Sequence, residues 1–190
     1  MQPRNLRHRR LLSSLTEGIT VRNATEADME GVRSIYSEYV LNGLATFEEI
    51  APSVDDLLAR RKSLISAGLP YLVADCDSEI LGYSYASPYH SRPAYRYTVE
   101  GSAYVARELG GRGVGGALLQ RLIERCERGP WRQMVAVIGD SENVASIALH
   151  RRMGFQLTGT LSAIGFKLRR WVDVVLMQRS FGPGDATNPM

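Results

Sequence analysis

A glycine run between two differently patterned segments is the feature of this sequence that most constrains its fold. Five of the seven residues at positions 110–116 are glycine. The run follows a strand-like stretch at residues 98–105 and precedes an apolar stretch at residues 117–128 that predicts a helix. Glycine allows positive φ angles and close approach of a ligand, and the N–H groups at a helix N-terminus attract phosphate. The run is therefore either a phosphate-binding loop or a tight strand-to-helix turn.

Two common phosphate motifs do not fit this run. A P-loop needs Lys-Ser or Lys-Thr after its last glycine, whereas Gly116 is followed by Ala117. A dinucleotide fingerprint needs a βαβ unit with an acidic residue for the ribose, and the flanking sequence does not supply one. If the run binds phosphate, it therefore belongs to another type of fold.

A second segment, about thirty residues further on, places three polar residues on one helix face. At about 100° per residue, Asn143, Ser146 and His150 point in the same direction. Gly154 ends this predicted helix and Phe155 begins the next strand. The three residues either form a binding surface beside the glycine run, or Asn143 is only a helix cap, Ser146 a tolerated small residue and His150 a half-exposed one.

The rest of the chain alternates predicted strands and helices. Two capping patterns mark helix starts, Thr25 with Asp28 and Ser53 with Asp56. The predicted strands cover residues 19–22, 71–74, 80–86, 97–105, 134–137, 155–160 and 171–178. This order indicates one α/β domain over residues 19–181 of the 190-residue chain.

Composition narrows the class of protein. The chain is 44% hydrophobic and 23% charged, which favours a compact globular domain. Much of its net charge of +3 comes from arginines near the N-terminus, so nucleic acid is not expected as a partner. Cys76 and Cys126 have neither metal-ligand nor redox spacing, which predicts no metal site and favours a reducing cytosol. No run predicts a membrane span, so no membrane partner is expected.

The two ends of the chain differ from the middle. Residues 1–18 are arginine-rich, which fits either an organellar transit peptide or a dispensable disordered tail. We prefer the tail, because a fold-like pattern begins only at Ile19. Residues 182–190 form a Gly/Pro/Asn-rich cluster without periodicity, which predicts a disordered C-terminal tail.

The glycine run and the Asn143 helix, taken in this order, resemble two motifs of the GNAT acyltransferase superfamily. The run is similar to its pyrophosphate loop, Arg/Gln-x-x-Gly-x-Gly/Ala, and residues 143–155 are similar to its Asn-x-x-Ser-x-x-Leu-(Tyr/His)-x-x-x-Gly-Phe helix. Residues 98–105 and 165–179 resemble the phosphinothricin N-acetyltransferase family, and the likeness extends from about Ile19 to about Arg179. The resemblance implies an α/β (α+β) fold with a mixed, mostly antiparallel sheet, splayed at an acetyl-CoA site and flanked by helices. It also implies acetyl-CoA as cosubstrate and a homodimer, while the cysteine usage favours a cytoplasmic location.

The resemblance implies a cofactor site made from three parts of the chain. Backbone groups of the strand before the glycine run would pair with the pantetheine arm, the run would hold the pyrophosphate, and the Asn143 helix would lie beside them. Gly110 departs from the superfamily, which usually has Arg or Gln there, and Arg112 or Arg107 would have to compensate. The expected cofactor-binding residues are Ala103, Tyr104, Val105, Gly111, Arg112, Gly113, Val114, Gly115, Gly116, Asn143 and Ser146.

Acyl transfer from a thioester to an amine needs a base for the ammonium group and a proton for the departing thiolate. By alternation, Glu100 shares a strand face with Ser102 and Tyr104. The resemblance implies that Glu100 is the general base, a role that burial and a raised pKa would suit. The alternative is a glutamate on a solvated sheet face. His150 matches the histidine of the phosphinothricin family, which implies either a general acid or a substrate contact.

The acceptor is expected beside a loop at residues 88–97, where aromatic residues alternate with arginines. Arg92 or Arg96 would bind a carboxylate or phosphinate in bidentate fashion, or both are ordinary solvated arginines. Phe47 stands at a family-like position after the first helix, where it is either a wall of the acceptor pocket or a core aromatic residue. Lys167 and Trp171 match a late Lys…Trp pair of the family, which lies either at the pocket or at a dimer interface. The expected acceptor-binding residues are Phe47, Arg92, Arg96, Glu100, Gly101, Ser102 and Lys167, with Trp171 as the partner of Lys167 in the family pattern.

Three functions are compatible with these residues. The first is an N-acetyltransferase acting on a small amino acid or its analogue, such as phosphinothricin or methionine sulfoximine. Arg169 and Arg170 replace residues that are small in much of that family and would narrow or recharge its acceptor site. The second is a protein N-terminal or polyamine acetyltransferase, which the arginine-containing loop disfavours. The third is a CoA-binding sensor without catalysis, against which the presence of Glu100 and His150 argues.

Overall fold

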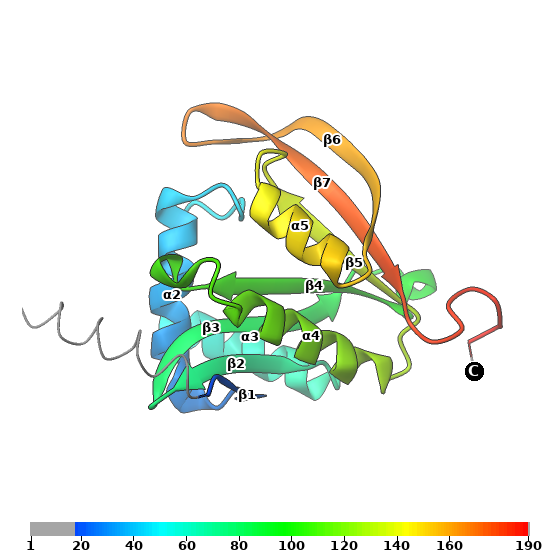
Figure 1. Cartoon of the computed structure of the whole chain (residues 1–190), viewed down its shortest axis with the longest axis horizontal. Coiled ribbons are helices and arrows are strands. Elements are labelled where there is room, and N and C mark those ends of the chain that lie inside the picture. Colours follow the sequence, from blue (N-terminus) through cyan, green and yellow to red (C-terminus); the bar gives the residue numbers. More distant parts are fainter. Residues whose placement is uncertain (1–17, 190) are drawn as a thin grey trace, which may run out of the picture.

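The computed structural model describes residues 18–189, which form one seven-stranded sheet flanked by helices (Figure 1). The strand order is β1-β2-β3-β4-β5-β7-β6, and every neighbouring pair is antiparallel except β4 and β5. The predicted mixed, mostly antiparallel sheet is therefore confirmed. The strands are β1 (Thr20–Asn23), β2 (Tyr71–Cys76), β3 (Glu79–Pro88), β4 (Thr98–Val105), β5 (Gln133–Gly139), β6 (Gln156–Lys167) and β7 (Arg170–Ser180).

Helices cover both faces of this sheet. Alternation along β2 divides the core, because Tyr71 and Val73 pack with α2 and α3 while Leu72 and Ala74 pack on the side of α4. Figure 1 shows α4 and α5 on the near face and α2 and α3 behind the sheet. The helices are α2 (Met29–Asn42), α3 (Val54–Ser66), α4 (Val114–Glu127) and α5 (Val144–Arg152), with short 3-10 turns η1 (Glu26–Asp28), η2 (Pro93–Tyr95) and η3 (Arg107–Leu109).

Both predicted capping patterns are confirmed. The carboxylate of Asp28 accepts hydrogen bonds from the Thr25 N–H at 2.6 Å and the Thr25 hydroxyl at 2.9 Å. Ser53 and Asp56 make the equivalent exchange before α3. Asp28 also accepts two hydrogen bonds of 2.8 Å from Arg22 of β1. The start of the first helical segment is thereby fastened to the edge of the sheet.

Two predicted boundaries are wrong, and each has a physical reason. The helix α4 begins at Val114 and not at residue 117, because Gly113 takes a φ of 86° as its N-cap and the next glycines enter the helix despite their low propensity. The strand β6 continues to Lys167 and does not end at residue 160. Its register against β7 shifts between Leu161 and Gly165, so a bulge interrupts the alternation on which the prediction relied.

The sheet opens between β4 and β5. These parallel strands pair only where residues 98–100 face residues 133–135. Beyond this point β4 follows β3 as far as Val105, and β5 follows β7 as far as Gly139. The two strands diverge, and their facing backbone edges are left without a strand partner in the opening. The predicted splay of the sheet is therefore confirmed.

Disordered tails were predicted at both ends of the chain. Residues 1–17 lie outside the described residues, so the disordered tail over residues 1–18 stays a prediction. Residues 182–189 form turns, and Arg132 donates hydrogen bonds to Thr187 at 3.3 Å and to the Asn188 carbonyl at 3.5 Å. Disorder over residues 182–190 also stays a prediction. Between residues 18 and 189, no helix combines the length and apolarity needed to cross a membrane.

We expect Asp28→Asn to destabilise the fold in a pH-dependent way. The hydrogen bonds from Arg22, helped by those from Thr25, lower the pKa of Asp28 to about 2. Because this pKa is lowered on folding, the carboxylate stabilises the fold above the unfolded pKa of about 3.9, and the stability is lost as pH falls towards 2. After allowance for solvent screening, the variant should lose about 1 kcal/mol at pH 7. Urea unfolding between pH 7 and pH 2 measures this, and a difference that stays constant over the range would contradict it.

Candidate active site

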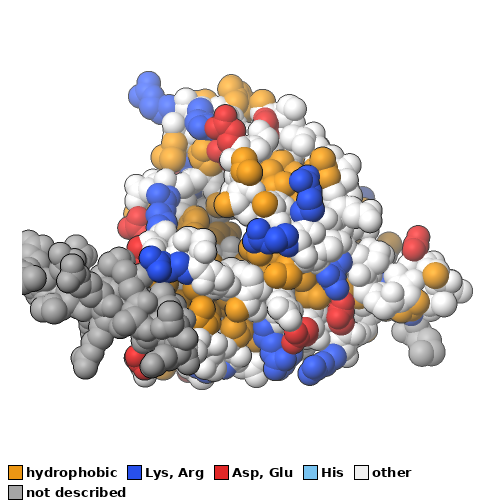
Figure 2. Space-filling model, in the orientation of Figure 1, with side chains coloured by type: hydrophobic (Ala, Val, Ile, Leu, Met, Phe, Trp, Pro, Cys, Tyr) orange, Lys and Arg blue, Asp and Glu red, His pale blue; other side chains and the backbone are white. Residues whose placement is uncertain are grey.

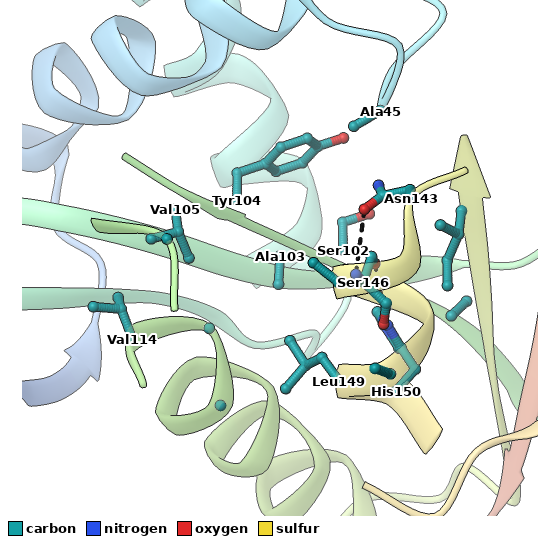
Figure 3. Close-up of a pocket in the computed structure, with 18 of the residues that line it drawn as sticks. Ala45, Ser102, Ala103, Tyr104, Val105, Val114, Asn143, Ser146, Leu149 and His150 are labelled. Atoms are coloured by element: carbon teal, nitrogen blue, oxygen red, sulfur yellow. Dashed lines mark hydrogen bonds between the residues drawn. The ribbon is translucent and has the colours of Figure 1, made fainter. Parts of the chain in front are cut away.

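A cleft of about 530 Å³ occupies the opening between β4 and β5 (Figure 3). Its walls come from β4, β5, the glycine run and α5, and the segment between α2 and α3 contributes Ala45. Gly101, Ser102 and His150 line it. The predicted cofactor residues that line it are Ala103, Tyr104, Val105, Gly111, Gly113, Val114, Gly115, Gly116, Asn143 and Ser146. The fold therefore brings the glycine run, the β4 strand and the polar face of α5 to one cavity.

The β4 edge of the cleft presents free backbone groups. Ala106 N–H donates to the Leu81 carbonyl at 2.9 Å, which fixes the phase of hydrogen bonding along β3 and β4. Residues 101, 103 and 105 consequently turn their N–H and C=O groups away from β3 and towards β5. The carbonyl of Val105 accepts a hydrogen bond from the Tyr39 hydroxyl at 2.6 Å. The Glu100–Val135 pair uses the N–H of Gly101. The Gly101 carbonyl and both groups of Ala103 are left for an extended ligand with amides of its own, which would add to β4 like a further strand.

The glycine run forms a phosphate-sized cradle at the start of α4. Gly111 and Gly113 have φ angles of 77° and 86°, a region in which residues with a side chain are strained. The first helical hydrogen bond joins Ala117 N–H to the Gly113 carbonyl at 3.0 Å. The N–H groups of residues 114–116 therefore have no partner within the helix. Unpartnered N–H groups at the positive end of a helix dipole fit a pyrophosphate.

The surrounding arginines differ in how free they are. Arg107 donates hydrogen bonds to the carbonyl oxygens of Glu38 at 3.3 Å and Asn42 at 2.7 Å, which fixes its guanidinium at the end of α2. Arg112 is exposed and lies outside the cleft lining. Figure 2 shows Lys and Arg side chains on the face that carries α4 and α5. Gly110 stands where the superfamily usually has Arg or Gln. Of the two arginines that could replace this contact with the pyrophosphate, Arg112 has a side chain free to do so, whereas that of Arg107 is held by α2.

The predicted face of α5 does turn to the cleft (Figure 3). Asn143 also caps the helix, because its Oδ1 accepts a hydrogen bond from Ser146 N–H at 3.2 Å. His150 is buried and not half-exposed, and its Nδ1 lies 2.9 Å from the Ser146 carbonyl oxygen. A carbonyl only accepts, so Nδ1 carries the proton and Nε2 is left as an acceptor. Burial lowers the pKa of His150 below its ordinary value, so the ring is neutral near pH 7.

Glu100 lies at the vertex of the opening. It is the last β4 residue paired with β5, and it stands opposite Ser87 of β3. By alternation it shares its face with Ser102 and Tyr104, which line the cleft. Its side chain is half-buried, and this burial raises the pKa of the Glu100 carboxyl above its ordinary value. A carboxylate with an increased affinity for a proton therefore stands where the two strands part.

The two arginines predicted to grip the acceptor lie on the surface around η2. Arg92 and Arg96 are both exposed and lie outside the cleft lining. Arg96 donates to the Pro93 carbonyl at 3.0 Å, and its guanidinium lies 4.8 Å from the centre of the Tyr97 ring. Arg92 is the less engaged of the two.

Phe47 and Lys167 connect the segment between α2 and α3 to the β6–β7 hairpin. The ring of Phe47 lies against Gly165, where an added Cβ would collide with it. Lys167 is buried, and its ammonium donates to the carbonyl oxygens of Thr46 at 2.7 Å and Tyr39 at 3.3 Å. Both residues therefore hold this segment in place, and their contact with an acceptor stays a prediction.

Sequence reasoning missed one wall of the cleft. Residues 136–139 of β5, together with Tyr39, Ala45 and Leu149, line it. The signal for residues 136–139 was the strand–helix–strand order around the glycine run, which places β5 parallel to β4. Tyr39 gave no such signal, because it falls among the apolar residues of the first predicted helix, where an aromatic side chain is expected to be core. Its hydrogen bond to the Val105 carbonyl could not be expected from that position.

Comparison with known proteins agrees with this geometry. The structure superimposes on a phosphinothricin acetyltransferase from Sinorhizobium meliloti solved in complex with AcCoA, with a TM-score of 0.87 and 46% identity over 90% of this chain and 93% of that one. The fold and the cleft thus define an acyltransferase that uses acetyl-CoA as cosubstrate. Residues 21–176 match the model of the acetyltransferase (GNAT) domain. The chain therefore belongs to the GNAT acetyltransferases.

Two curated relatives lie within that family. The chain is 49% identical over 170 residues to phosphinothricin N-acetyltransferase from Alcaligenes faecalis, covering 90% of this chain and 86% of the relative. It is 38% identical over 165 residues to the L-methionine sulfoximine/L-methionine sulfone acetyltransferase of Pseudomonas aeruginosa, covering 86% and 95% of the two chains. The resemblance to the phosphinothricin N-acetyltransferase family is therefore confirmed.

We expect Gly113→Ala to weaken CoA binding about tenfold, because the left-handed backbone at this position costs a residue with a Cβ about 1–2 kcal/mol. If the backbone relaxed to relieve this strain, the N–H groups at the start of α4 would no longer point at the pyrophosphate of CoA. Gly110→Ala is the matched control, since Gly110 has a φ of −54° and its added Cβ would meet only the Arg107 carbonyl oxygen at 3.5 Å. Isothermal titration with CoA measures both dissociation constants. Equal changes in the two variants would rule out a role for the Gly113 conformation.

Proposed function

We propose that this enzyme transfers the acetyl group of acetyl-CoA to the amino group of a small amino-acid-like acceptor, such as phosphinothricin or methionine sulfoximine. The observation that carries the proposal is the half-buried Glu100 at the vertex of the cleft, with its raised pKa. The relatives named for acetylation of phosphinothricin and of methionine sulfoximine support this class of acceptor. Of the runner-up acceptors, a protein N-terminus is supported by a solved structure named ribosomal-protein-alanine N-acetyltransferase from Brucella melitensis, which is 35% identical over 85% of this chain and 99% of that one. The 49% identity to a phosphinothricin N-acetyltransferase favours the small-molecule acceptor over it.

Acetyl-CoA supplies the thioester carbonyl that the acceptor amine attacks. Glu100 removes a proton from the acceptor ammonium, directly or through a water molecule, and so frees the lone pair of the nitrogen. The β4 backbone at residues 101 and 103 holds the pantetheine arm, and the N–H groups of residues 114–116 hold the pyrophosphate. These contacts fix the thioester beside Glu100, so proximity adds to base catalysis.

The remaining part of the proposed chemistry concerns His150. Its ring is neutral and lines the cleft, with Nδ1 donating to the Ser146 carbonyl and Nε2 left as a hydrogen-bond acceptor. A ring without a proton on Nε2 does not donate one to the departing thiolate. When the carbon–sulfur bond breaks, the second proton that the attacking nitrogen loses neutralises the thiolate of CoA instead. This favours the substrate contact over the general acid among the two roles considered for His150.

The acceptor carboxylate is assigned to the exposed arginines around η2. Arg92 is the better candidate, because Arg96 already donates to Pro93 and stacks on Tyr97. A guanidinium binds a carboxylate with two parallel hydrogen bonds, which would orient the amino group relative to Glu100. A CoA-binding sensor would need neither this arginine nor the carboxylate.

We further propose a homodimer that forms through the β6–β7 hairpin, in the cytoplasm. Phe166 and Trp171 form an edge-to-face pair on this hairpin and are 58% and 65% exposed. A contiguous apolar surface of this kind is typical of an interface. Cys76 and Cys126 are buried free thiols, which suits a reducing compartment.

We expect Glu100→Gln to lower kcat about 100-fold or more while the KM for acetyl-CoA changes less than twofold, because general base catalysis contributes about 10²–10⁴-fold. The wild-type rate should fall as pH drops through the raised pKa of Glu100, and this acidic limb should be absent from the variant. A raised folded-state pKa also means that ionised Glu100 destabilises the fold at neutral pH, so the variant should melt at no lower temperature. A pH–rate profile and a melting curve measure these effects. A variant with full activity would remove Glu100 from this role.

The acceptor class is tested by thiol release from acetyl-CoA with a panel of acceptors. We expect turnover with phosphinothricin, methionine sulfoximine or methionine sulfone, and none with a peptide or spermidine, because a carboxylate next to the amine is part of the recognition. Activity on the peptide alone would refute the small-molecule assignment. Binding of CoA without turnover on any acceptor would favour the sensor.

A further inference from the structure

A second stripe of residues on α5 faces the acetyl-CoA cleft, beside the stripe formed by Asn143, Ser146 and His150. Its members are spaced as i, i+3, i+4 and i+7, which places them on one helix face. They are Ala145, Ala148, Leu149 and Arg152, and all four line the cleft. Among residues 18–189, Arg152 is the one lysine or arginine in this lining, which holds no carboxylate. The cleft therefore has a single cation, at the C-terminal end of α5.

The Arg152 side chain is available to a ligand. It is exposed, and it forms no ion pair with any residue between 18 and 189. Arg151 is also exposed and has no ion pair in the same part of the chain, but it lies outside the cleft lining. Both arginines lie in the last turn of α5, where a positive charge favours the helix dipole. That stabilising role is common to the two, and contact with the cleft distinguishes Arg152.

The end of α5 that carries Arg152 lies against the start of α4. A Cβ built on Gly115 would lie 3.3 Å from Cδ2 of Leu149. One built on Gly116 would lie 3.8 Å from Cε of Met153. Figure 3 shows Leu149 between the two helices. Leu149 and Met153 lie one turn before Arg152 and directly after it, so Arg152 stands next to the N–H groups that fit the pyrophosphate.

The shape of CoA decides which of its groups comes near this arginine. Its pyrophosphate joins the pantetheine arm to an adenosine that carries a 3′-phosphate. With the arm running from the glycine run along β4 into the cleft, the adenosine would leave on the outer side, at the rim where Arg152 is exposed. A phosphate monoester carries about −1.5 to −2 charges at pH 7. The C-terminal end of a helix repels anions, so a cation is needed to hold this phosphate beside α5.

We propose that Arg152 binds the 3′-phosphate of CoA and thereby makes the enzyme select CoA over 3′-dephospho-CoA. A guanidinium donates two parallel hydrogen bonds to phosphate oxygens, which a lysine in its place would not. The contact also offsets the departure at Gly110, because it gives the cofactor a cationic partner outside the glycine run. The proposal concerns the cofactor and is independent of which acceptor the enzyme uses.

The test is isothermal titration of CoA and of 3′-dephospho-CoA into the wild type, Arg152→Gln and Arg151→Gln. The two ligands differ only in the phosphate. We expect the wild type to bind CoA about tenfold more tightly and Arg152→Gln to keep at most about a twofold preference, as for one charge-assisted contact at an exposed site. Arg151→Gln is the matched control and should keep the wild-type preference. Added salt should reduce the preference of the wild type, because it screens exposed charges.

The outcomes separate this proposal from its alternatives. Equal weakening of both ligands by Arg152→Gln would overturn it and place Arg152 at the pyrophosphate. A preference that Arg152→Gln leaves unchanged, or that Arg151→Gln loses to the same extent, would also overturn it. Arg152→Lys keeps the charge and should retain part of the preference, which a purely structural role would not predict. A wild type that prefers CoA in this way but acetylates no acceptor would refute the proposed function and leave the role of Arg152 standing.

Discussion

The early end of the β4–β5 pairing is the constraint on which the whole site depends. The two strands share a ladder over residues 98–100 and 133–135 only, after which each is held by its other neighbour. An interruption inside a sheet normally leaves backbone groups unpaired, which is costly when they are buried. Here the cost is limited because the Gly101 carbonyl and the backbone groups of Ala103 face a cleft that a ligand with amides can enter. The binding edge is therefore a consequence of the strand divergence itself.

The divergence is maintained by packing on both sides of the opening. Gly139, at the end of β5, lies so close to the backbone of Leu44 and Ala45 that no side chain would fit there. Tyr39 takes up the Val105 carbonyl at the other rim. These contacts keep the strands apart in the absence of ligand, so the ordering cost of forming the cleft has already been met when acetyl-CoA binds.

The sequence predicted the parts of the site that depend on residues close together in the chain. The glycine run, the two capping boxes and the Asn143 face depend on backbone angles and helical spacing within a few residues, and the structure has all of them. The β5 wall could have been expected from the strand–helix–strand order around the glycine run, but Ala45 meets the cleft only through tertiary contacts that no local pattern encodes. The long chain of Lys167 illustrates the same limit. Its family-like position predicted an acceptor contact, but which carbonyl oxygens its ammonium reaches depends on where the segment after α2 lies.

The segment between α2 and α3 also connects the β6–β7 hairpin to α2 and to the cleft. Thr46 accepts from Lys167 of the hairpin and exchanges a hydrogen bond with Tyr36 of α2, while Ala45 lines the cleft. The Tyr36 hydroxyl donates in turn to Glu48. The segment is thus bonded on one side to the hairpin proposed as the dimer surface, and on the other to Tyr36 of α2. Because hydrogen bonds of this kind transmit position and not charge, a shift of the hairpin would act on the cleft through the placement of Ala45. The Tyr39 and Thr46 carbonyls that accept from Lys167 connect the hairpin to the cleft.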